Sequence, residues 1–465
     1  MRLYRIAQIH RFSGLSLGLV LLILSITGFF LNHDNFNILW NITFNKDSLP
    51  SDITKKTTQS FNAFKVNIDN PDHLMTGSRM GFFISVDAGK TYKKTLDKQV
   101  LAIEPERQFG IENYSQIFTA TTDGVYQSQD GGNKWKRVAL EGEVVESLSS
   151  FNGFLYAVVD KRTIYKIHIP SGKTQNLPFT PIASDVLPTE ISLGRLVRDL
   201  HYGRGIFSGD SSLFINDFSA LVLVFLSISG FVIYLLTKRL RDRKMDNKQT
   251  FFLIRMLHSN KLMLFSFVPI LLLLITGVML DHPDFFKQVM RKTKLETGYL
   301  TPVYRDLSTD IWGIDFDGEN YRIGNRLGVF KSTDLKTWSL ENKGFAWRMK
   351  RVNDALYVSG MGSPNRTLSG IEWKVLSGTA HMPRDFFSSD QTVMTFSKEK
   401  NQNFPLPVIH EVPLYYVLLS LHDGKFFHEY WVYINDLASL VALLLLITGL
   451  IKWRRRQLQT VKCTN

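Results

Sequence analysis

Hydrophobic residues are concentrated in four long runs of this 465-residue chain, and short apolar and polar stretches alternate between the runs. The runs are Phe12–Asn32, Phe218–Leu236, Leu262–Leu280 and Leu437–Lys452, and none carries a charge at its centre. A helix needs roughly 20 residues to cross a bilayer. A segment inside lipid must also satisfy its own backbone hydrogen bonds, so each run is predicted to be a transmembrane helix.

The two halves of the chain repeat one another. Three segments recur in order: Ile26–Phe36 as Ile275–Phe285, Leu200–Arg204 as Leu421–Lys425, and Ile215–Asp217 as Ile434–Asp436. The predicted fold class is therefore a membrane protein whose four transmembrane α-helices are a duplicated two-helix unit.

The two long segments between the runs have the strand-and-turn spacing of an all-β fold. Three turns share one pattern, Ser-x-Asp followed by an aromatic residue: Ser85–Tyr92, Ser128–Trp135 and Ser332–Trp338. This pattern resembles the Asp-box of β-propeller hairpins, in which the Asp bonds the turn backbone and the aromatic ring packs beneath it. We expect about three blades in the first segment, two or three in the second, and one propeller built from both. The Asp-box is expected to be structural.

These patterns divide the chain into eight parts. They are residues 1–32 (first transmembrane helix), 33–189 (β-rich), 190–237 (amphipathic helix and second transmembrane helix), 238–261 (basic loop), 262–281 (third transmembrane helix), 282–410 (β-rich), 411–453 (amphipathic helix and fourth transmembrane helix) and 454–465 (tail).

The distribution of charge predicts the topology. Residues 1–11, 237–261 and 452–465 hold 16 basic and 2 acidic residues, or +14, so the rest of the chain carries −1 of the formal +13. Basic residues favour the cytoplasmic side, which places both termini and the central loop there and the β-rich segments outside. A nucleic-acid partner would need a basic face on a folded domain, and the pattern contains none.

The first apolar run is too long for the core of a signal peptide and no small-residue cleavage site follows it, so we interpret it as a retained anchor. The one cysteine, Cys463, lies in the predicted cytoplasmic tail, so the exported segments contain no disulfide. These features indicate a bacterial inner-membrane protein with periplasmic domains.

Six of the eleven histidines lie near the ends of the apolar runs, in three duplicated pairs: His10 and His258, His33 and His282, and His201 and His422. The first pair is predicted at the cytoplasmic face and the other four residues at the periplasmic face. Two histidines at one depth on facing helices suit bis-imidazole haem ligation. Small residues in the helices, among them Gly28, Gly230, Gly277 and Gly449, would allow close helix approach or leave room for a ring.

Basic residues near these histidines could hold haem propionates: Arg11 and Arg255 on the inside, and Arg204 and Lys425 on the outside. An alternative interpretation is that the histidines are interfacial residues, hydrogen-bonded to headgroups or water.

The flanks of the helices resemble the bacterial PepSY-associated transmembrane family. The similarity rests on Ile9-His10-Arg11-Phe12, on Thr27-Gly28, and on the His-x-Gly-Arg/Lys signatures at His201 and His422. The resemblance implies b-type haem and electron transfer to a periplasmic acceptor, as in the family's ferric-siderophore reductases. This sequence departs from the family pattern in having Asp-box hairpins where a PepSY module is expected, and His258-Ser259 where His-Arg is usual.

The favoured hypothesis is a b-haem inner-membrane oxidoreductase that passes electrons across the membrane to ferric iron or a ferric chelate. Haem b, one to three per chain with two preferred, would be held through its iron by His10, His258, His201 and His422. No dinucleotide or flavin fingerprint is present, so a membrane quinol or a cytoplasmic reductase would donate electrons. The alternative is a non-enzymatic membrane anchor whose propeller binds or assembles a periplasmic partner.

Overall fold

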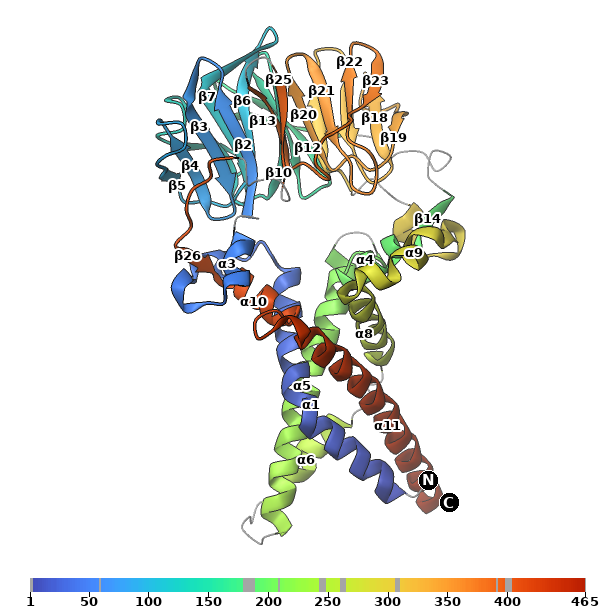
Figure 1. The fold of residues 1–465 in the computed structure, drawn as a ribbon. Helices are drawn as coiled ribbons and strands as arrows, with labels where there is room; N and C mark the ends of the chain where they lie inside the picture. The colour runs from blue at the N-terminus through green and yellow to red at the C-terminus, as the bar shows by residue number, and fades with distance from the viewer. Residues whose placement is uncertain are drawn as a thin grey trace. The chain divides into compact units, whose positions relative to one another are not determined.

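The computed structural model describes residues 3–57, 60–178, 189–207, 210–241, 248–259, 265–305, 310–389, 392–397 and 404–464 (Figure 1). The chain forms two compact units. The helical unit comprises Met1–Leu39, Thr189–Tyr304 and Leu414–Asn465, and the β unit comprises Trp40–Pro188 and Arg305–Pro413. Each unit is therefore assembled from both halves of the sequence.

The helical unit repeats one arrangement of helices. In the first half these are α1 (Leu3–Asn32), α4 (Leu193–His201) and α5 (Asp210–Arg241). In the second half they are α6 (Lys248–His258), α8 (Phe267–Asp281), α9 (Pro283–Lys292), α10 (Leu414–His422) and α11 (Val432–Thr464). Helix α4 packs on α8, and α10 packs on α1, so each short helix lies against the other half.

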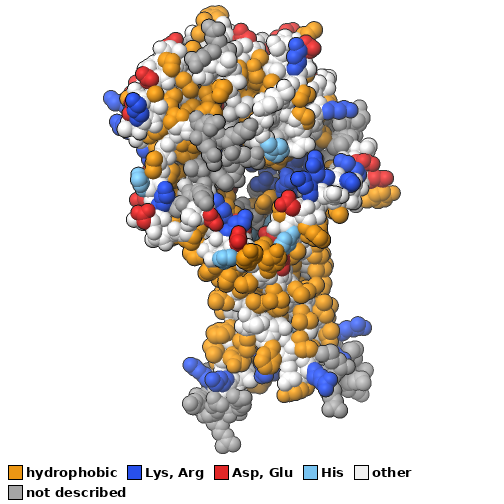
Figure 2. Space-filling view, in the orientation of Figure 1, with side chains coloured by type: hydrophobic (Ala, Val, Ile, Leu, Met, Phe, Trp, Pro, Cys, Tyr) orange, Lys and Arg blue, Asp and Glu red, His pale blue; other side chains and the backbone are white. Residues whose placement is uncertain are grey.

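Among the helices that the structure describes, three are long and apolar enough to cross a membrane: Tyr4–Asn32, Ser211–Leu240 and Glu429–Arg455. A fourth span exists if α8 and α9, which meet at a bend of 109°, count as one. Hydrophobic side chains predominate over the middle of the helical unit on the face that Figure 2 shows. The third predicted run begins at residues 262–264, which lie outside the described residues, and its described helix is α8.

The helical unit extends beyond the predicted boundary at residue 281, to Tyr304. Helix α9 packs against α4, and a short ladder joins β14 (Glu190–Ser192) to β15 (Lys294–Glu296). A second ladder joins β1 (Thr43–Asn45) to β26 (Glu411–Pro413) within the β unit. In both ladders the strand that precedes a short histidine-bearing helix pairs with a strand of the other half.

Apart from the β1–β26 ladder, the described residues of the β unit contain five four-stranded antiparallel sheets and one two-stranded sheet. The strands of the first half are β2 (Phe61–Asn67), β3 (Asn70–Ser78), β4 (Gly81–Ser85), β5 (Lys93–Leu96), β6 (Val100–Gln108), β7 (Ile111–Thr121), β8 (Gly124–Ser128), β9 (Lys136–Ala139), β10 (Val145–Phe151), β11 (Phe154–Val159), β12 (Thr163–His168) and β13 (Lys173–Leu177). Those of the second half are β16 (Gly313–Phe316), β17 (Tyr321–Gly324), β18 (Gly328–Ser332), β19 (Ser339–Lys343), β20 (Arg348–Val352), β21 (Ala355–Ser359), β22 (Arg366–Ser369), β23 (Glu372–Val375), β24 (Asp385–Ser389) and β25 (Thr392–Phe396). The prediction of three blades and then two or three is confirmed.

The six sheets form a closed ring. The first strand of each sheet contacts the first strand of the next, in the order β2, β6, β10, β16, β20 and β24, and β24 contacts β2 again. Figure 1 shows the sheets arranged as blades around this ring. The two segments therefore build one propeller-like unit together, as the sequence predicts.

The Asp-box turns connect the third and fourth strands of three blades. Asp130 accepts hydrogen bonds from the Ser128 hydroxyl and the Lys134 backbone N–H, both at 2.8 Å. Trp135 donates its indole N–H to the carbonyl of Gly132 at 3.1 Å. Each bond closes the turn on itself, so the motif is structural here, as predicted.

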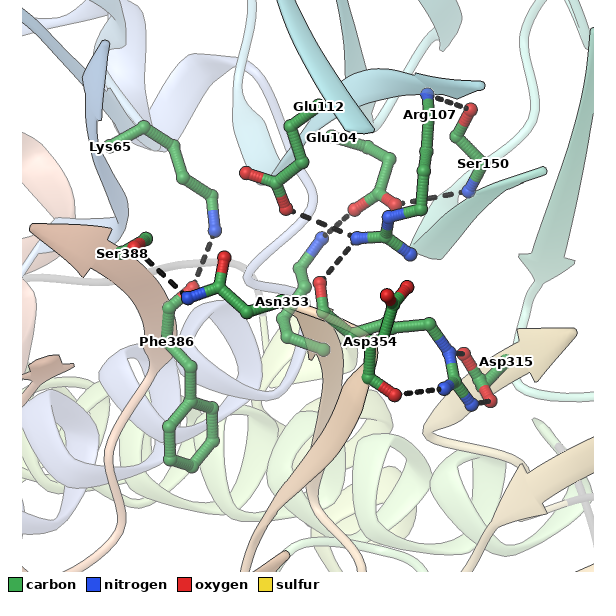
Figure 3. A network of polar contacts seen from close by, with 12 residues as sticks. Lys65, Glu104, Arg107, Glu112, Ser150, Asp315, Asn353, Asp354, Phe386 and Ser388 are labelled. Carbon is green, nitrogen blue, oxygen red and sulfur yellow. Dashed lines mark hydrogen bonds and ion pairs between the residues drawn. The ribbon is translucent and has the colours of Figure 1, made fainter. Parts of the chain in front are cut away.

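Buried charges join the innermost strands at the centre of the ring (Figure 3). Lys350 Nζ lies 2.7 Å from Glu104 Oε2, and Lys65 Nζ lies 3.0 Å from Asp385 Oδ1. Burial alone would raise the pKa of Glu104, but the charges of Lys350 and Arg107 outweigh it and hold that pKa below its usual range. These pairs link residues of the first half to residues of the second.

Candidate functional site

Four of the six predicted histidines lie in two facing pairs within the helical unit. The imidazole centroids of His10 on α1 and His258 on α6 are 6.4 Å apart, with an angle of 83° between the rings. The centroids of His201 on α4 and His422 on α10 are 6.3 Å apart, with an angle of 51°. Each pair takes one histidine from each half, so the duplication creates two equivalent sites between the halves.

A hydroxyl group of a long helix holds each of these histidines. The contacts between ring Nδ1 and hydroxyl oxygen are His10–Thr448 at 2.8 Å, His258–Ser229 at 2.7 Å, His201–Thr276 at 3.1 Å and His422–Thr27 at 2.9 Å. In every contact the hydroxyl comes from the half of the chain that does not carry the histidine. The two halves therefore depend on each other for the orientation of all four rings.

A glycine follows each of these hydroxyl residues and lies against the same ring. A Cβ atom at Gly28 would lie 3.1 Å from Cε1 of His422, and one at Gly277 would lie 3.3 Å from Cε1 of His201. The corresponding distances are 3.6 Å for Gly230 and His258, and 3.8 Å for Gly449 and His10. The glycines thus leave space for the imidazole rings, and a side chain would come closest to a ring at Gly28 and Gly277.

The spacing of the pairs fits two imidazoles on opposite sides of one iron. A metal–nitrogen bond of about 2 Å and about 1 Å from that nitrogen to the ring centroid, on each side, separate the centroids by about 6 Å. A six-coordinate haem whose iron is ligated on both faces by the protein takes two axial ligands. Among the described residues, no group of three or more His, Cys, Asp or Glu side chains could hold a bare metal ion. The donor set of each pair, two facing imidazoles at this spacing, fits a haem iron.

Helix α1 belongs to both sites. It carries His10 of one pair and Thr27, which holds His422 of the other pair. The two residues are 27 − 10 = 17 positions apart, which is about 25 Å along the helix axis. The two sites therefore lie at well-separated depths along the helices.

His33 and His282 do not face another histidine. Nε2 of His33 lies 2.9 Å from Oδ2 of Asp217, and Nε2 of His282 lies 2.7 Å from Oδ2 of Asp436. Both contacts stay within one half of the chain. This third pair of histidines therefore joins the two helices of each half and lacks the facing geometry of the other four.

The asparagines beside these aspartates hold the histidine-bearing short helices. Asn216 donates from Nδ2 to the carbonyls of Leu200 and His201, both at 3.0 Å. Asn435 donates in the same way to the carbonyl of His422 at 2.9 Å. In each repeated Ile-Asn-Asp sequence, the asparagine therefore holds the end of the short helix, α4 or α10. The aspartate pairs with the histidine that ends a span, His33 or His282.

The four basic residues predicted to hold propionates are exposed. Arg11, Arg255, Arg204 and Lys425 each follow or precede a histidine of the two pairs by one to three positions. The guanidinium of Arg11 lies over the ring of Phe12, 5.5 Å from its centroid.

The site predicted from the sequence does not include the four hydroxyl residues or the two aspartates that the structure places there. A signal for the hydroxyls was present, because every apolar run contains a Ser-Gly or Thr-Gly pair at the required position: Thr27-Gly28, Ser229-Gly230, Thr276-Gly277 and Thr448-Gly449. A hydroxyl in an apolar helix bonds its own backbone readily, so the sequence alone gives no reason to assign it a histidine partner.

The family described as PepSY-associated TM region matches residues 7–456 of the chain. Among curated proteins, none matches the sequence.

Solved structures similar to the chain have low identity to it. An ancestral GH74 enzyme is 12% identical, with a TM-score of 0.32, and the match covers 70% of this chain and 32% of that one. YCF48 from Cyanidioschyzon merolae is 10% identical, with a TM-score of 0.30 and 66% of each chain covered. BamB from Moraxella catarrhalis is 10% identical, with a TM-score of 0.25 and coverage of 64% and 80%. The chain thus spans about a third of the length of the GH74 enzyme.

Proposed function

The chain belongs to the PepSY-associated transmembrane family, and on this basis we propose that it is a b-haem oxidoreductase of the bacterial inner membrane. It passes electrons across the membrane to a periplasmic acceptor such as ferric iron or a ferric chelate. The observation that carries the proposal is the pair of histidine sites, each with centroids 6.3–6.4 Å apart.

In this proposal His10 and His258 would hold one haem b, and His201 and His422 would hold a second. Haem b supplies a one-electron couple at its iron when bound. Arg11 directly follows His10, while Arg204 and Lys425 follow their histidines by three positions. Their charges complement propionates at the two ends of the helical unit.

The orientation follows from the basic residues. The N-terminus, the central loop and the tail carry the excess of Lys and Arg, which supports a cytoplasmic location for all three. His10 and His258 then lie toward the cytoplasm, and His201 and His422 toward the periplasm. The two sites lie about 25 Å apart along α1, so an electron would cross the membrane in steps shorter than its full thickness.

The electron donor lies outside the chain in this proposal. A membrane quinol or a cytoplasmic reductase would serve the inner site. The propeller-like unit offers a periplasmic surface for the acceptor or for a protein partner. Propeller folds serve many functions, so the fold of this unit does not itself select the acceptor.

The proposal is tested in vesicles that contain the purified protein, a trapped ferric chelate and a trapped chromogenic Fe(II) chelator. With dithionite outside, we expect Fe(II) to form inside much faster than in protein-free vesicles, and His10→Ala to abolish the difference. His33→Ala is the matched control, since His33 pairs with Asp217, and it should retain the rate. Equal rates with and without protein would contradict transmembrane electron transfer and favour a membrane-anchored binding protein.

The glycine contacts predict a graded effect on haem content. Gly28→Ala places a Cβ 3.1 Å from the His422 ring, whereas Gly449→Ala places one 3.8 Å from the His10 ring. The first distance forces the ring to move and the second is an ordinary contact. We therefore expect Gly28→Ala to lower occupancy of the His201–His422 site severalfold and Gly449→Ala to leave both sites filled, as measured by haem absorbance per chain. Equal loss in both variants would contradict the role assigned to Gly28.

A further inference from the structure

The four hydroxyl groups that contact the histidines have already used their single proton. Each donates to the carbonyl four residues earlier in its own helix: Thr27 to Ile23 at 2.7 Å, Ser229 to Phe225 at 2.6 Å, Thr276 to Leu272 at 2.7 Å and Thr448 to Leu444 at 2.7 Å. A hydroxyl carries one proton and two acceptor lone pairs. Toward the histidine, each hydroxyl oxygen is therefore an acceptor.

This arrangement fixes the tautomer of the imidazole rings. Because the hydroxyl oxygen accepts, Nδ1 of each histidine must carry the proton and donate it. In a neutral imidazole one nitrogen is a donor and the other holds the lone pair. The lone pair of His10, His201, His258 and His422 is therefore on Nε2, the nitrogen across the ring from the hydroxyl.

The backbone-bonded hydroxyl is common in this protein, but its contact with a histidine is specific. Ser25, Ser219 and Thr237 also donate to the carbonyl four residues earlier, at 2.6–2.8 Å. Within the part of the chain that the structure describes, none of these three hydroxyls is hydrogen-bonded to a histidine. The four histidine-bound hydroxyls differ in being followed by a glycine that leaves space for the imidazole. The hydroxyl and the glycine thus form one cradle, and each of the long helices α1, α5, α8 and α11 carries one.

We propose that Thr27, Ser229, Thr276 and Thr448 are positioning residues that hold each histidine with Nδ1 protonated and Nε2 ready to bind iron. This inference rests on the proposed function, because it assigns these residues a role toward the same haems. A hydrogen-bond acceptor at the outer nitrogen of a ligating histidine fixes its orientation and raises its basicity. A more basic ligand favours the oxidised iron, so the hydroxyl also lowers the reduction potential of the site.

The test replaces the hydroxyl without changing the size of the side chain, in the full-length protein. Thr448→Val should shift the oxidation–reduction equilibrium of the His10–His258 haem about tenfold toward the reduced form, which is about 59 mV for one electron. It should also change the electron paramagnetic resonance signal of that ferric haem alone. Thr27→Val should act on the other haem. Thr448→Ser keeps the hydroxyl and should restore the wild-type potential.

Matched controls separate the hydroxyl effect from general damage to the helices. Thr237→Val removes a hydroxyl that bonds the helix backbone in α5 without contacting a histidine, and it is the control for Thr448→Val. Ser219→Ala removes a similar hydroxyl and is the control for Ser229→Ala. Neither control should move a potential. Loss of one haem in Thr448→Val, with full retention in Thr448→Ser, would also support the proposal. Wild-type potentials in both valine variants, or equal shifts in the controls, would overturn it.

A second measurement keeps the inference separate from the proposed function. In isotope-labelled protein, the ¹⁵N resonances of the imidazole rings distinguish a proton on Nδ1 from one on Nε2 whether or not haem is bound. If the purified wild-type protein contains no haem, that result contradicts the proposed function. The positioning role would then stand if Thr448→Val changes the tautomer of His10, and would fall if the tautomer is unchanged or if wild-type His10 carries its proton on Nε2.

Discussion

His10→Ala is expected to reduce the haem content of the purified protein from about two per chain to about one, because an axial ligand is lost from one iron. His258→Ala should remove the same haem, and the double variant should lose no more than either single variant. His201→Ala and His422→Ala should behave in the same way toward the other haem. Pyridine haemochrome absorbance per chain measures each result.

Combinations across the two pairs give a sharper outcome. His10→Ala with His422→Ala should remove both haems, since each substitution affects a different site. His33→Ala and His282→Ala should keep both, because these histidines contact Asp217 and Asp436. A haem lost through His33→Ala, or retained in the double variant across the pairs, would contradict the assignment of ligands.

Lys350→Met is expected to destabilise the propeller-like unit by about 3–5 kcal/mol, the usual consequence of leaving one buried charge without its partner. Lys350 and Glu104 have side chains that are 8% and 4% exposed. Glu104 also accepts the backbone N–H of Ser150 at 3.0 Å (Figure 3). The carboxylate would therefore lose the ammonium group that contacts it and stay buried at the centre of the ring. Urea unfolding followed by tryptophan fluorescence measures the loss.

Two further variants test the cause of that loss. Glu104→Gln added to Lys350→Met removes the unpaired charge and should recover part of the stability. Lys374→Met breaks a pair with Glu372 whose side chains are 64% and 68% exposed, and it should change the free energy of unfolding by less than about 0.5 kcal/mol. An equal loss in Lys350→Met and Lys374→Met would show that burial of the pair is unimportant.

The pairing of His10 with His258 could be predicted because the duplication and the helix lengths fix depth. Depth could not separate His201 and His422 from His33 and His282, which the sequence places near the same membrane face. What separates them is the direction in which each side chain points around the helix. The 23 residues from His10 to His33 turn the side-chain direction on α1 by about 140°. His33 therefore faces α5, where Asp217 lies, and the short helices α4 and α10 supply the second pair instead.

The propeller could be predicted from its turns, whose residues act locally. Ser128, Asp130 and Trp135 close the turn through hydrogen bonds that span only a few positions, so the pattern is visible in the sequence. Closure of the ring depends on pairs such as Lys65 with Asp385, 320 positions apart. Nothing in the local pattern around either residue specifies its partner, and so the charged centre of the ring appeared only in the structure.

The most direct measurement is the absorption spectrum of the detergent-purified protein, expressed with ample haem, before and after dithionite. We predict a Soret band, a sharp b-type α band on reduction, and about two haems per chain with both axial positions filled by imidazole. A colourless protein that is nonetheless folded would contradict the central claim. The paired histidines would then be contacts between the two halves of the chain, and the protein would be a membrane-anchored propeller whose partner is sought in the periplasm.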